Sequence, residues 1–185
     1  METSNKTTLL NHLENQVESH LQQAIREYQN LTPNFLLKPS ITGGWSIAQC
    51  LAHLNSYGDY YLPVFEKGLQ SSPDTTVENT IKSTWLGRKC IESMSSETSK
   101  KKYNAFKAYQ PTPNLDAKIV VAEFITQQER MLQIIRTAYR KDIQQIKIPI
   151  SIAKFLKLYL GDALQFLIVH NERHVQQANR NLGLL

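Results

Sequence analysis

Four long segments of the chain carry apolar residues at alternating steps of three and four, and no other feature constrains the fold as much. This spacing places the apolar side chains along one face of an α-helix. A single amphipathic helix cannot bury such a face, but four of them can bury their faces against one another in a bundle. The sequence therefore predicts an all-α, four-helix bundle whose helices span residues 4–30, 46–65, 114–139 and 158–181.

The start of the second segment carries the clearest local signal. Ser46 is followed three residues later by Gln49. In such a capping box the serine hydroxyl accepts a backbone N–H bond, and the glutamine amide reaches back to the start of the helix. Pro63 lies late in the same segment. Because proline lacks an amide hydrogen, we expect it to kink or end this helix.

A long connection, residues 70–113, separates the second and third helices and contains one short helical segment, 81–94. A connection of this length lets the two helices that it joins run parallel, which predicts an up-down-down-up order. Strand signals are weak throughout the chain. Residues 146–152, IKIPISI, have strand-forming side chains, but Pro149 argues against a central strand.

Composition places the chain among globular proteins with a single domain, residues 1–185. Hydrophobic residues make up 41% of the sequence and charged residues 20%, which is enough to bury a core and argues against disorder. No apolar run reaches the roughly 18 residues that a membrane span needs. The polar N-terminus lacks the apolar stretch of a signal peptide. We therefore expect a cytoplasmic protein with no membrane partner.

The net charge of +5 and the two cysteines point to no further function. Part of the positive charge lies in Lys100–Lys102, which we interpret as a solvated loop because no nucleic-acid-binding motif surrounds it. We expect no nucleic-acid partner. Cys50 and Cys90 lack the spacing of a metal site, and the cytoplasm disfavours a disulfide between them. Cys50 is expected to be a small buried apolar residue.

Two histidines of the fourth helix carry the main chemical signal. His170 and His174 stand four residues apart, on the helix face that also carries Ala163, Leu167 and Ala178. Both imidazoles are therefore expected to point into the bundle, and their spacing lets them bind one metal ion. Two ligands hold an ion poorly, so a third must come from another helix.

His53, in the second helix, is the best candidate for that third ligand because it lies beside the apolar face. Gln49, Tyr57 and Tyr60 lie on the same side of this helix. Three neutral imidazoles with an open coordination position form a catalytic type of metal site. Such a site lowers the pKa of a bound water molecule or thiol.

An alternative without metal stays open on these residues. Histidine pairs four residues apart are often surface or capping residues, Gln49 can be only a capping partner, and the tyrosines can be ordinary core. His12 and His20 have polar neighbours and are expected to face solvent. Glu172 and Arg173 lie about 100° or more around the helix from the two histidines. They are therefore expected on the surface or in an interface.

Two short motifs together resemble the DinB-like superfamily, whose members are also called YfiT-like metalloenzymes. GGWSIAQCLAHL, residues 43–54, is similar to the helix-two signature of this family, in which Trp-Ser is followed a few residues later by an apolar residue, histidine and leucine. HNERHVQQANR, residues 170–180, is similar to its helix-four signature. The order and spacing of the two motifs also fit, as does the long crossover with its lysines and prolines. The resemblance covers essentially the whole chain.

The resemblance implies an up-down-down-up bundle that is often dimeric, so we expect a homodimer. It also implies a divalent metal ion, such as zinc, nickel or iron, held by His53, His170 and His174. Known members of the superfamily include S-transferases that use bacillithiol or glutathione, and a maleylpyruvate isomerase that uses mycothiol. Many other members have no known activity.

These observations give one leading hypothesis and two competitors. In the leading one, a metal-dependent S-transferase joins a low-molecular-weight thiol to a small-molecule electrophile. Gln49, Tyr57 and Tyr60 would orient the substrate or the ligands, and Trp45 would anchor the end of the bundle. The first competitor is metal-dependent hydrolysis with water at the same three histidines. The second is a non-catalytic binding or dimerisation module.

Overall fold

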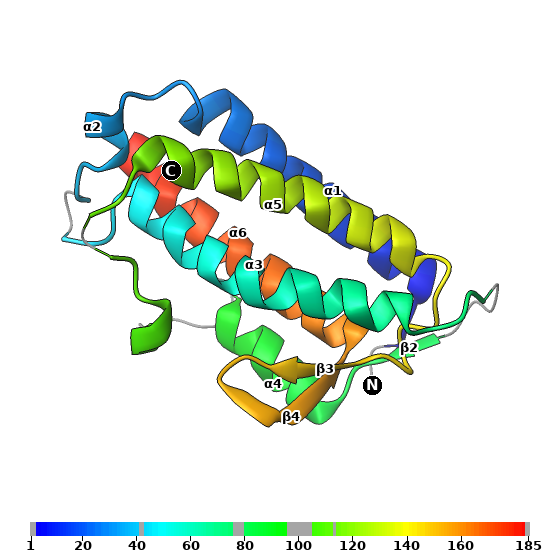
Figure 1. Ribbon diagram of the computed structural model, residues 1–185. Coiled ribbons are helices and arrows are strands. Elements are labelled where there is room, and N and C mark those ends of the chain that lie inside the picture. The colour runs from blue at the N-terminus through cyan, green and yellow to red at the C-terminus, as the bar shows by residue number, and fades with distance from the viewer. Residues whose placement is uncertain (1–2, 41–42, 76–79, 96–104, 113, 184–185) are drawn as a thin grey trace.

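The computed structural model describes residues 3–40, 43–75, 80–95, 105–112 and 114–183. Four long helices form its body (Figure 1): α1 (Lys6–Gln23), α3 (Ile47–Gln70), α5 (Ala117–Ala138) and α6 (Leu160–Leu182). The shorter helices are the π-helix η1 (Ala24–Tyr28), α2 (Pro33–Leu36), α4 (Trp85–Met94) and the 3₁₀ helix η2 (Lys107–Tyr109). The strands are β1 (Thr3–Asn5), β2 (Thr80–Lys82), β3 (Lys147–Ile150) and β4 (Ala153–Tyr159).

The four long helices run in the order up, down, down, up (Figure 1). Helices α1 and α6 point one way along the bundle, and α3 and α5 point the other way. Helix α3 packs against α5 and α6, and α1 packs against the same two helices. The connection from α3 to α5 returns along the bundle, and its helix α4 packs on α6. The predicted four-helix bundle and its order are confirmed.

The start of α3 follows its sequence signal, but its end does not. Ser46 Oγ accepts a hydrogen bond from the Gln49 backbone N–H at 3.2 Å, and Gln49 Oε1 accepts one from the Ser46 backbone N–H at 2.9 Å. Pro63 does not end the helix, because α3 continues to Gln70. In a regular helix the residue at position 63 would donate its backbone N–H to the carbonyl of Asp59. Pro63 has no N–H, and both residues lie on the exposed side of α3. Solvent can take this hydrogen bond instead.

Three segments that the sequence assigned to helices begin as strands. Ser4 and Asn5, at the start of the predicted first helix, lie in β1, and α1 starts only at Lys6. Ile81 lies in β2, which pairs with β1, and α4 starts only at Trp85, where the Thr84 side chain caps it. Leu158 lies in β4, and the last helix starts at Leu160. Ile81 and Leu158 are both buried apolar residues. A single such residue fits the helical period and the strand period equally well, which explains the misassignment.

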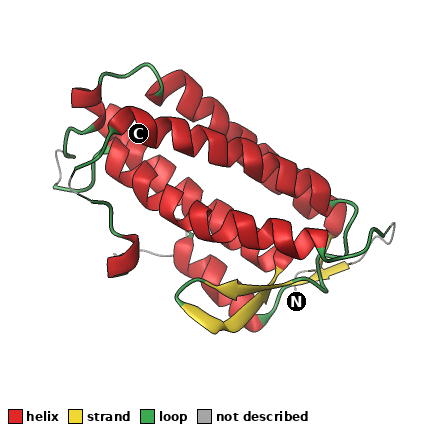
Figure 2. Cartoon of the chain, viewed as in Figure 1, coloured by secondary structure: helices red, strands yellow, loops and turns green. Residues whose placement is uncertain are grey.

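Strands β3 and β4 form an antiparallel hairpin at one edge of the bundle, which the sequence indicated only weakly (Figure 2). Ile148 and Leu158 pair across it, and both are 1% exposed, so the inner face of the hairpin joins the core. Pro149 has no amide hydrogen to give to a partner strand. A two-stranded sheet tolerates this because each strand is an edge strand.

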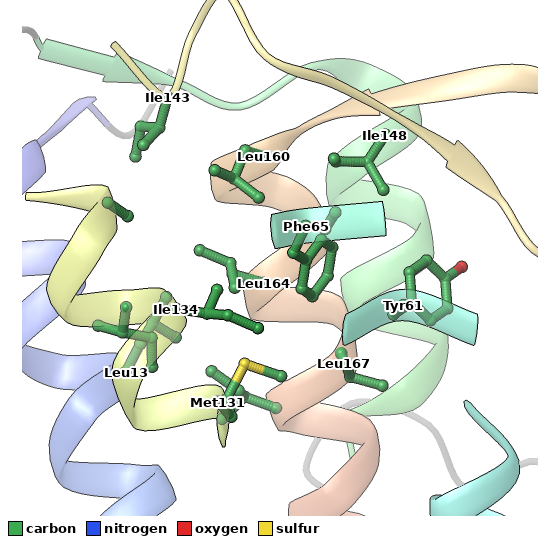
Figure 3. Close-up of a cluster of buried hydrophobic side chains, with 14 of the residues drawn as sticks. Leu13, Tyr61, Phe65, Met131, Ile134, Ile143, Ile148, Leu160, Leu164 and Leu167 are labelled. Carbon is green, nitrogen blue, oxygen red and sulfur yellow. The ribbon is translucent and has the colours of Figure 1, made fainter. Parts of the chain in front are cut away.

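Two apolar clusters fill the bundle, one toward each end of α3. The larger surrounds Phe65 and Leu164 and extends to the hairpin (Figure 3). The smaller surrounds Leu51 and Phe124 and includes Cys50, which is fully buried as predicted. Both cysteines are free. The site described below lies between these two clusters.

The composition also predicted a solvated lysine loop and no membrane-spanning segment. The predicted solvated loop at Lys100–Lys102 lies outside the described residues. Within the described part of the chain, no helix combines the length and the apolar character that crossing a membrane requires.

Replacing the fully buried Phe65 with alanine should destabilise the protein by about 3–5 kcal/mol, because a cavity replaces the ring. Thermal and urea unfolding, followed by circular dichroism, measure this loss. Phe155→Ala is the matched control: that ring is 85% exposed, so its removal should change the stability by less than about 0.5 kcal/mol. Equal effects of the two substitutions would contradict this assignment of the core.

Candidate metal centre

His53, His170 and His174 meet between the two apolar clusters. His53 lies on α3, and the other two lie one turn apart on α6, which packs against α3. One ring nitrogen from each of the three histidines lies within 4.8 Å of the other two. His53 is 2% exposed and His170 is 3% exposed. Two packed helices thus bring three imidazoles to one buried point.

Hydrogen bonds fix the orientation of two of these rings. His53 Nδ1 lies 2.7 Å from the carbonyl oxygen of Tyr109, and His174 Nδ1 lies 2.9 Å from Oε1 of Gln177. Both oxygens can only accept, so each Nδ1 carries the proton and donates it. The Nε2 of each neutral ring keeps its lone pair. Metal-binding histidines usually have this arrangement, with the second ring nitrogen donating to an oxygen.

The third ring is held differently. His170 Nε2 lies 3.2 Å from His53 Nε2, and His170 Nδ1 is buried with no hydrogen-bond partner among the described residues. If the proton of His170 is on Nδ1, this N–H is unsatisfied and two lone pairs face each other. If the proton is on Nε2, the Nδ1 lone pair is unsatisfied. Either form costs free energy, because a buried polar atom has lost water without gaining a partner.

The donor set fits a divalent ion, which would remove the repulsion between the facing lone pairs. Two imidazole nitrogens bound tetrahedrally to zinc, each at about 2.0–2.1 Å, lie about 3.3 Å apart. The Nε2 atoms of His53 and His170 are 3.2 Å apart, close to that separation. Imidazole ligands also suit nickel, iron and copper.

Burial keeps the three imidazoles neutral. It lowers the pKa of His53, and it lowers the pKa of His170 well below the usual histidine value. The pKa of His174 falls to about 3, first through burial and then through repulsion from a positive charge on His53. An imidazole with a lowered pKa stays neutral near pH 7, so one of its two ring nitrogens carries no proton. Only an unprotonated ring nitrogen binds a metal ion, so the three rings are in the form that a metal requires.

Aromatic rings enclose the three imidazoles. The ring centre of Tyr57 lies 4.5 Å from that of His170, and the ring centre of Tyr109 lies 4.2 Å from that of Tyr57. The ring of Trp45 stacks on His174 at 5.7 Å. Trp45, which was expected to anchor the end of the bundle, packs against the smaller apolar cluster and also forms part of the wall of the site. Such walls exclude water, which strengthens the electrostatic interactions inside.

The structure brings one of the three predicted pocket residues, Tyr57, to the histidines. Gln49 uses its amide oxygen in the capping box. The hydroxyl of Tyr60 donates to the carbonyl of Pro149 at 3.4 Å, so this side chain lies against the hairpin. Tyr60 is seven residues from His53, which places it about 10 Å farther along the helix axis. Residues on the same helix face can therefore lie too far apart along the helix axis to form one site.

Sequence reasoning missed two groups that orient the rings. Gln177 follows His174 by three residues, the spacing of neighbours on one helix face, so the sequence did carry this signal. The carbonyl of Tyr109 comes from η2 in the long connection, 56 residues from His53. No local pattern indicates this second contact, because it depends on how the connection returns along the bundle.

The expectation that His20 faces solvent is wrong. Glu172, expected on the surface or in an interface, is partly exposed and contacts α1. His20 is 1% exposed, and its Nε2 lies 2.6 Å from Oε2 of Glu172. This hydrogen bond is the main reason why the pKa of Glu172 is lowered. Arg173 is only partly buried, and His12 is exposed as predicted. The hydrogen bond between His20 and Glu172 therefore connects α1 to the turn of α6 that carries the two site histidines.

A sequence model of the DinB superfamily matches residues 16–178, which include all three histidines. The chain belongs to the DinB superfamily. No curated protein matches it. A solved structure, YfiT from Bacillus subtilis, is described as a probable metal-dependent hydrolase with an unusual four-helix bundle topology. The two sequences are 18% identical, and the two structures superpose with a TM-score of 0.54. The match covers 97% of this chain and 89% of the YfiT chain. At this identity the likeness supports the fold alone.

We predict that this DinB superfamily member, purified without a histidine tag, binds one divalent ion through His53, His170 and His174. Replacing any one of the three with alanine should abolish tight binding, because two imidazoles hold an ion poorly. Elemental analysis after loading with zinc, nickel or iron measures the occupancy. His12→Ala is the control, since His12 is exposed and should leave the occupancy unchanged. Full occupancy in His53→Ala, or none in the wild type, would contradict the site.

Gln177→Ala should weaken metal binding by about 10- to 100-fold, because the His174 ring loses the acceptor that fixes its orientation. Competition with a chelating dye measures the dissociation constant. Gln133→Ala is the matched control, because Gln133 is an exposed glutamine in the middle of α5. If both variants bind as tightly as the wild type, Gln177 does not orient the ligand.

Proposed function

We propose that this DinB superfamily member is a divalent-metal-dependent S-transferase that acts on small molecules. The proposal is carried by the convergence of three neutral imidazoles, His53, His170 and His174, in a buried aromatic site. Zinc, nickel and iron are the ions that we expect there. An ion bound in this way lowers the pKa of a thiol or water molecule at its open position and so supplies a nucleophile near neutral pH.

The surroundings of the imidazoles favour a thiol over water as the nucleophile. Among the described residues, no carboxylate forms a hydrogen bond or an ion pair with any of the three rings. Activation of water benefits from a nearby general base, whereas a thiol, with an ordinary pKa of about 8.5, releases its proton more readily. Tyr57 does not supply that base, because burial raises the pKa of its hydroxyl to about 12.

The charges near the site favour an anionic cosubstrate. Arg173 and Arg180 lie close enough to His174 to contribute to its lowered pKa, after the larger effects of burial and of His53. Their positive potential attracts thiols that carry carboxylates, such as glutathione and bacillithiol. The rings of Trp45 and Tyr57 offer apolar surface to the electrophile.

The transfer itself needs no further cosubstrate. The thiol sulfur forms a bond to the electrophilic carbon, and the bond from that carbon to its leaving group breaks. The leaving group departs with the electron pair, and the thiol proton passes to solvent. In this step the protonated hydroxyl of Tyr57 acts as a hydrogen-bond donor that orients the electrophile.

Metal-dependent hydrolysis at the same three histidines is the second candidate function. It is favoured by the description of YfiT from Bacillus subtilis as a probable metal-dependent hydrolase. Hydrolysis requires no thiol, so the two candidates differ in their cosubstrate. A non-catalytic binding or dimerisation module is the competitor from another class, and it predicts no activity that depends on the histidines. The homodimer and the cytoplasmic location stay predictions.

Turnover by the metal-loaded protein distinguishes these functions. The protein is loaded with zinc, nickel or iron in turn and mixed with chlorodinitrobenzene and either glutathione or bacillithiol. A separate reaction contains nitrophenyl acetate and no thiol. We expect thioether formation faster than the uncatalysed background only when both the metal and a thiol are present, and we expect the rate to fall to that background in His170→Ala.

The controls separate the possible failures of this experiment. His12→Ala should keep full activity, because His12 is exposed on α1. Ester cleavage without thiol that is lost in His170→Ala would establish hydrolysis in place of transfer. Activity of His170→Ala equal to that of the wild type in both reactions would contradict both enzymatic functions.

A further inference from the structure

The outer face of the β3–β4 hairpin carries two lysines on neighbouring strands. Lys147 pairs with Tyr159, and Pro149 pairs with Lys157, so the two lysines are diagonal neighbours on one face. Because side chains alternate along a strand, this face is opposite the one that enters the core. Both lysines are exposed.

A groove runs between this face and the start of α4. Its volume is about 300 Å³, and it is lined by Thr84, Lys147, Phe155, Lys157, Leu158 and Tyr159. The groove lies apart from the three histidines, none of which lines it. It therefore has no part in the chemistry proposed above.

No described carboxylate forms an ion pair with the lysines of the groove, Lys147 and Lys157. Asp162, behind Thr84, is only 1% exposed and accepts hydrogen bonds from Ser83 and Thr84, so its carboxylate does not face the groove freely. Two like charges on diagonal positions repel each other. An anion in the groove relieves this repulsion.

Apolar side chains project beside the charged groove. Phe155 is 85% exposed and Ile152 is 51% exposed, both on the hairpin. Trp85, the residue after Thr84, is 68% exposed. Exposed aromatic residues together with lysines are typical of segments that lie in the interface of a membrane, where the rings enter the headgroup region and the lysines meet anionic lipids.

Other occupants explain less of this surface. In a two-fold interface with a second copy, the same patch meets itself, so lysines would face lysines. A free small anion would neutralise Lys147 and Lys157 but would leave Phe155 and Ile152 in water. A membrane surface with anionic headgroups and an apolar interior contacts both the lysines and the apolar side chains.

We propose that the β3–β4 hairpin docks on an anionic phospholipid surface. A headgroup phosphate occupies the groove between Lys147 and Lys157, and Phe155 enters the interfacial region. The expectation of no membrane partner rested on the lack of a spanning segment. A docking hairpin needs no such segment.

Sedimentation with lipid vesicles tests this docking. The full chain should bind vesicles of phosphatidylcholine mixed with phosphatidylserine, should not bind vesicles of phosphatidylcholine alone, and should be released by salt. The double variant Lys147→Gln/Lys157→Gln should bind about 30-fold more weakly, since each lysine near an anionic surface contributes about fivefold. Phe155→Ala should bind at least about tenfold more weakly.

Matched controls lie at the other end of the bundle, near α2 (Figure 1). Lys38 is exposed and Phe35 is 39% exposed, so Lys38→Gln and Phe35→Ala should leave vesicle binding unchanged. All the substituted side chains are solvent-exposed, and unchanged circular dichroism verifies that each variant is folded.

Three outcomes would overturn the proposal. The first is equal binding to the neutral and the anionic vesicles, or no binding to either. The second is anionic vesicle binding that the hairpin variants do not weaken. The third is binding of inorganic phosphate or of single-stranded RNA through Lys147 and Lys157 in the absence of vesicle binding, which would make the groove a site for another anion.

Discussion

The packing of α3 against α6 is the interaction on which the rest of the structure depends. The apolar neighbours of His53 on α3 and of His170 on α6 belong to the two core clusters, so the same burial that holds these helices together also removes the imidazoles from water. Burying polar rings costs free energy unless they are paired. Tyr109 and Gln177 pair two of the rings, and the facing Nε2 atoms of His53 and His170 mark the point where an ion fits.

The long crossover between α3 and α5 has two consequences for function. Because it returns along the bundle, α3 and α5 run parallel, and α6 is left to pack against α3 with its histidines facing His53. The same crossover brings the Tyr109 carbonyl to His53 and the start of α4 to the β3–β4 hairpin. The crossover thus contributes to the histidine site and also to the groove between the β3–β4 hairpin and the start of α4.

The errors at Pro63 and Leu158 have the same physical origin. Pro63 was expected to end α3, but the rest of the helix is held by packing of Phe65 and Leu69 in the core, which outweighs the loss of one exposed hydrogen bond. Leu158 was assigned to a helix because one buried leucine satisfies either period, and only pairing with Ile148 decides in favour of the strand. Local propensity was overridden by tertiary contacts in both places.

The sequence by itself determined the four helices and the helix faces on which His53, His170 and His174 lie. These features depend on spacing along one chain segment, and helical geometry converts spacing directly into direction. Only the tertiary structure decided which nitrogen of His53 and of His174 is free, that His20 is buried against Glu172, and that Lys147 and Lys157 share a groove with Thr84. Each of these depends on atoms from segments far apart in the chain, whose approach is set by the packing of whole helices and strands.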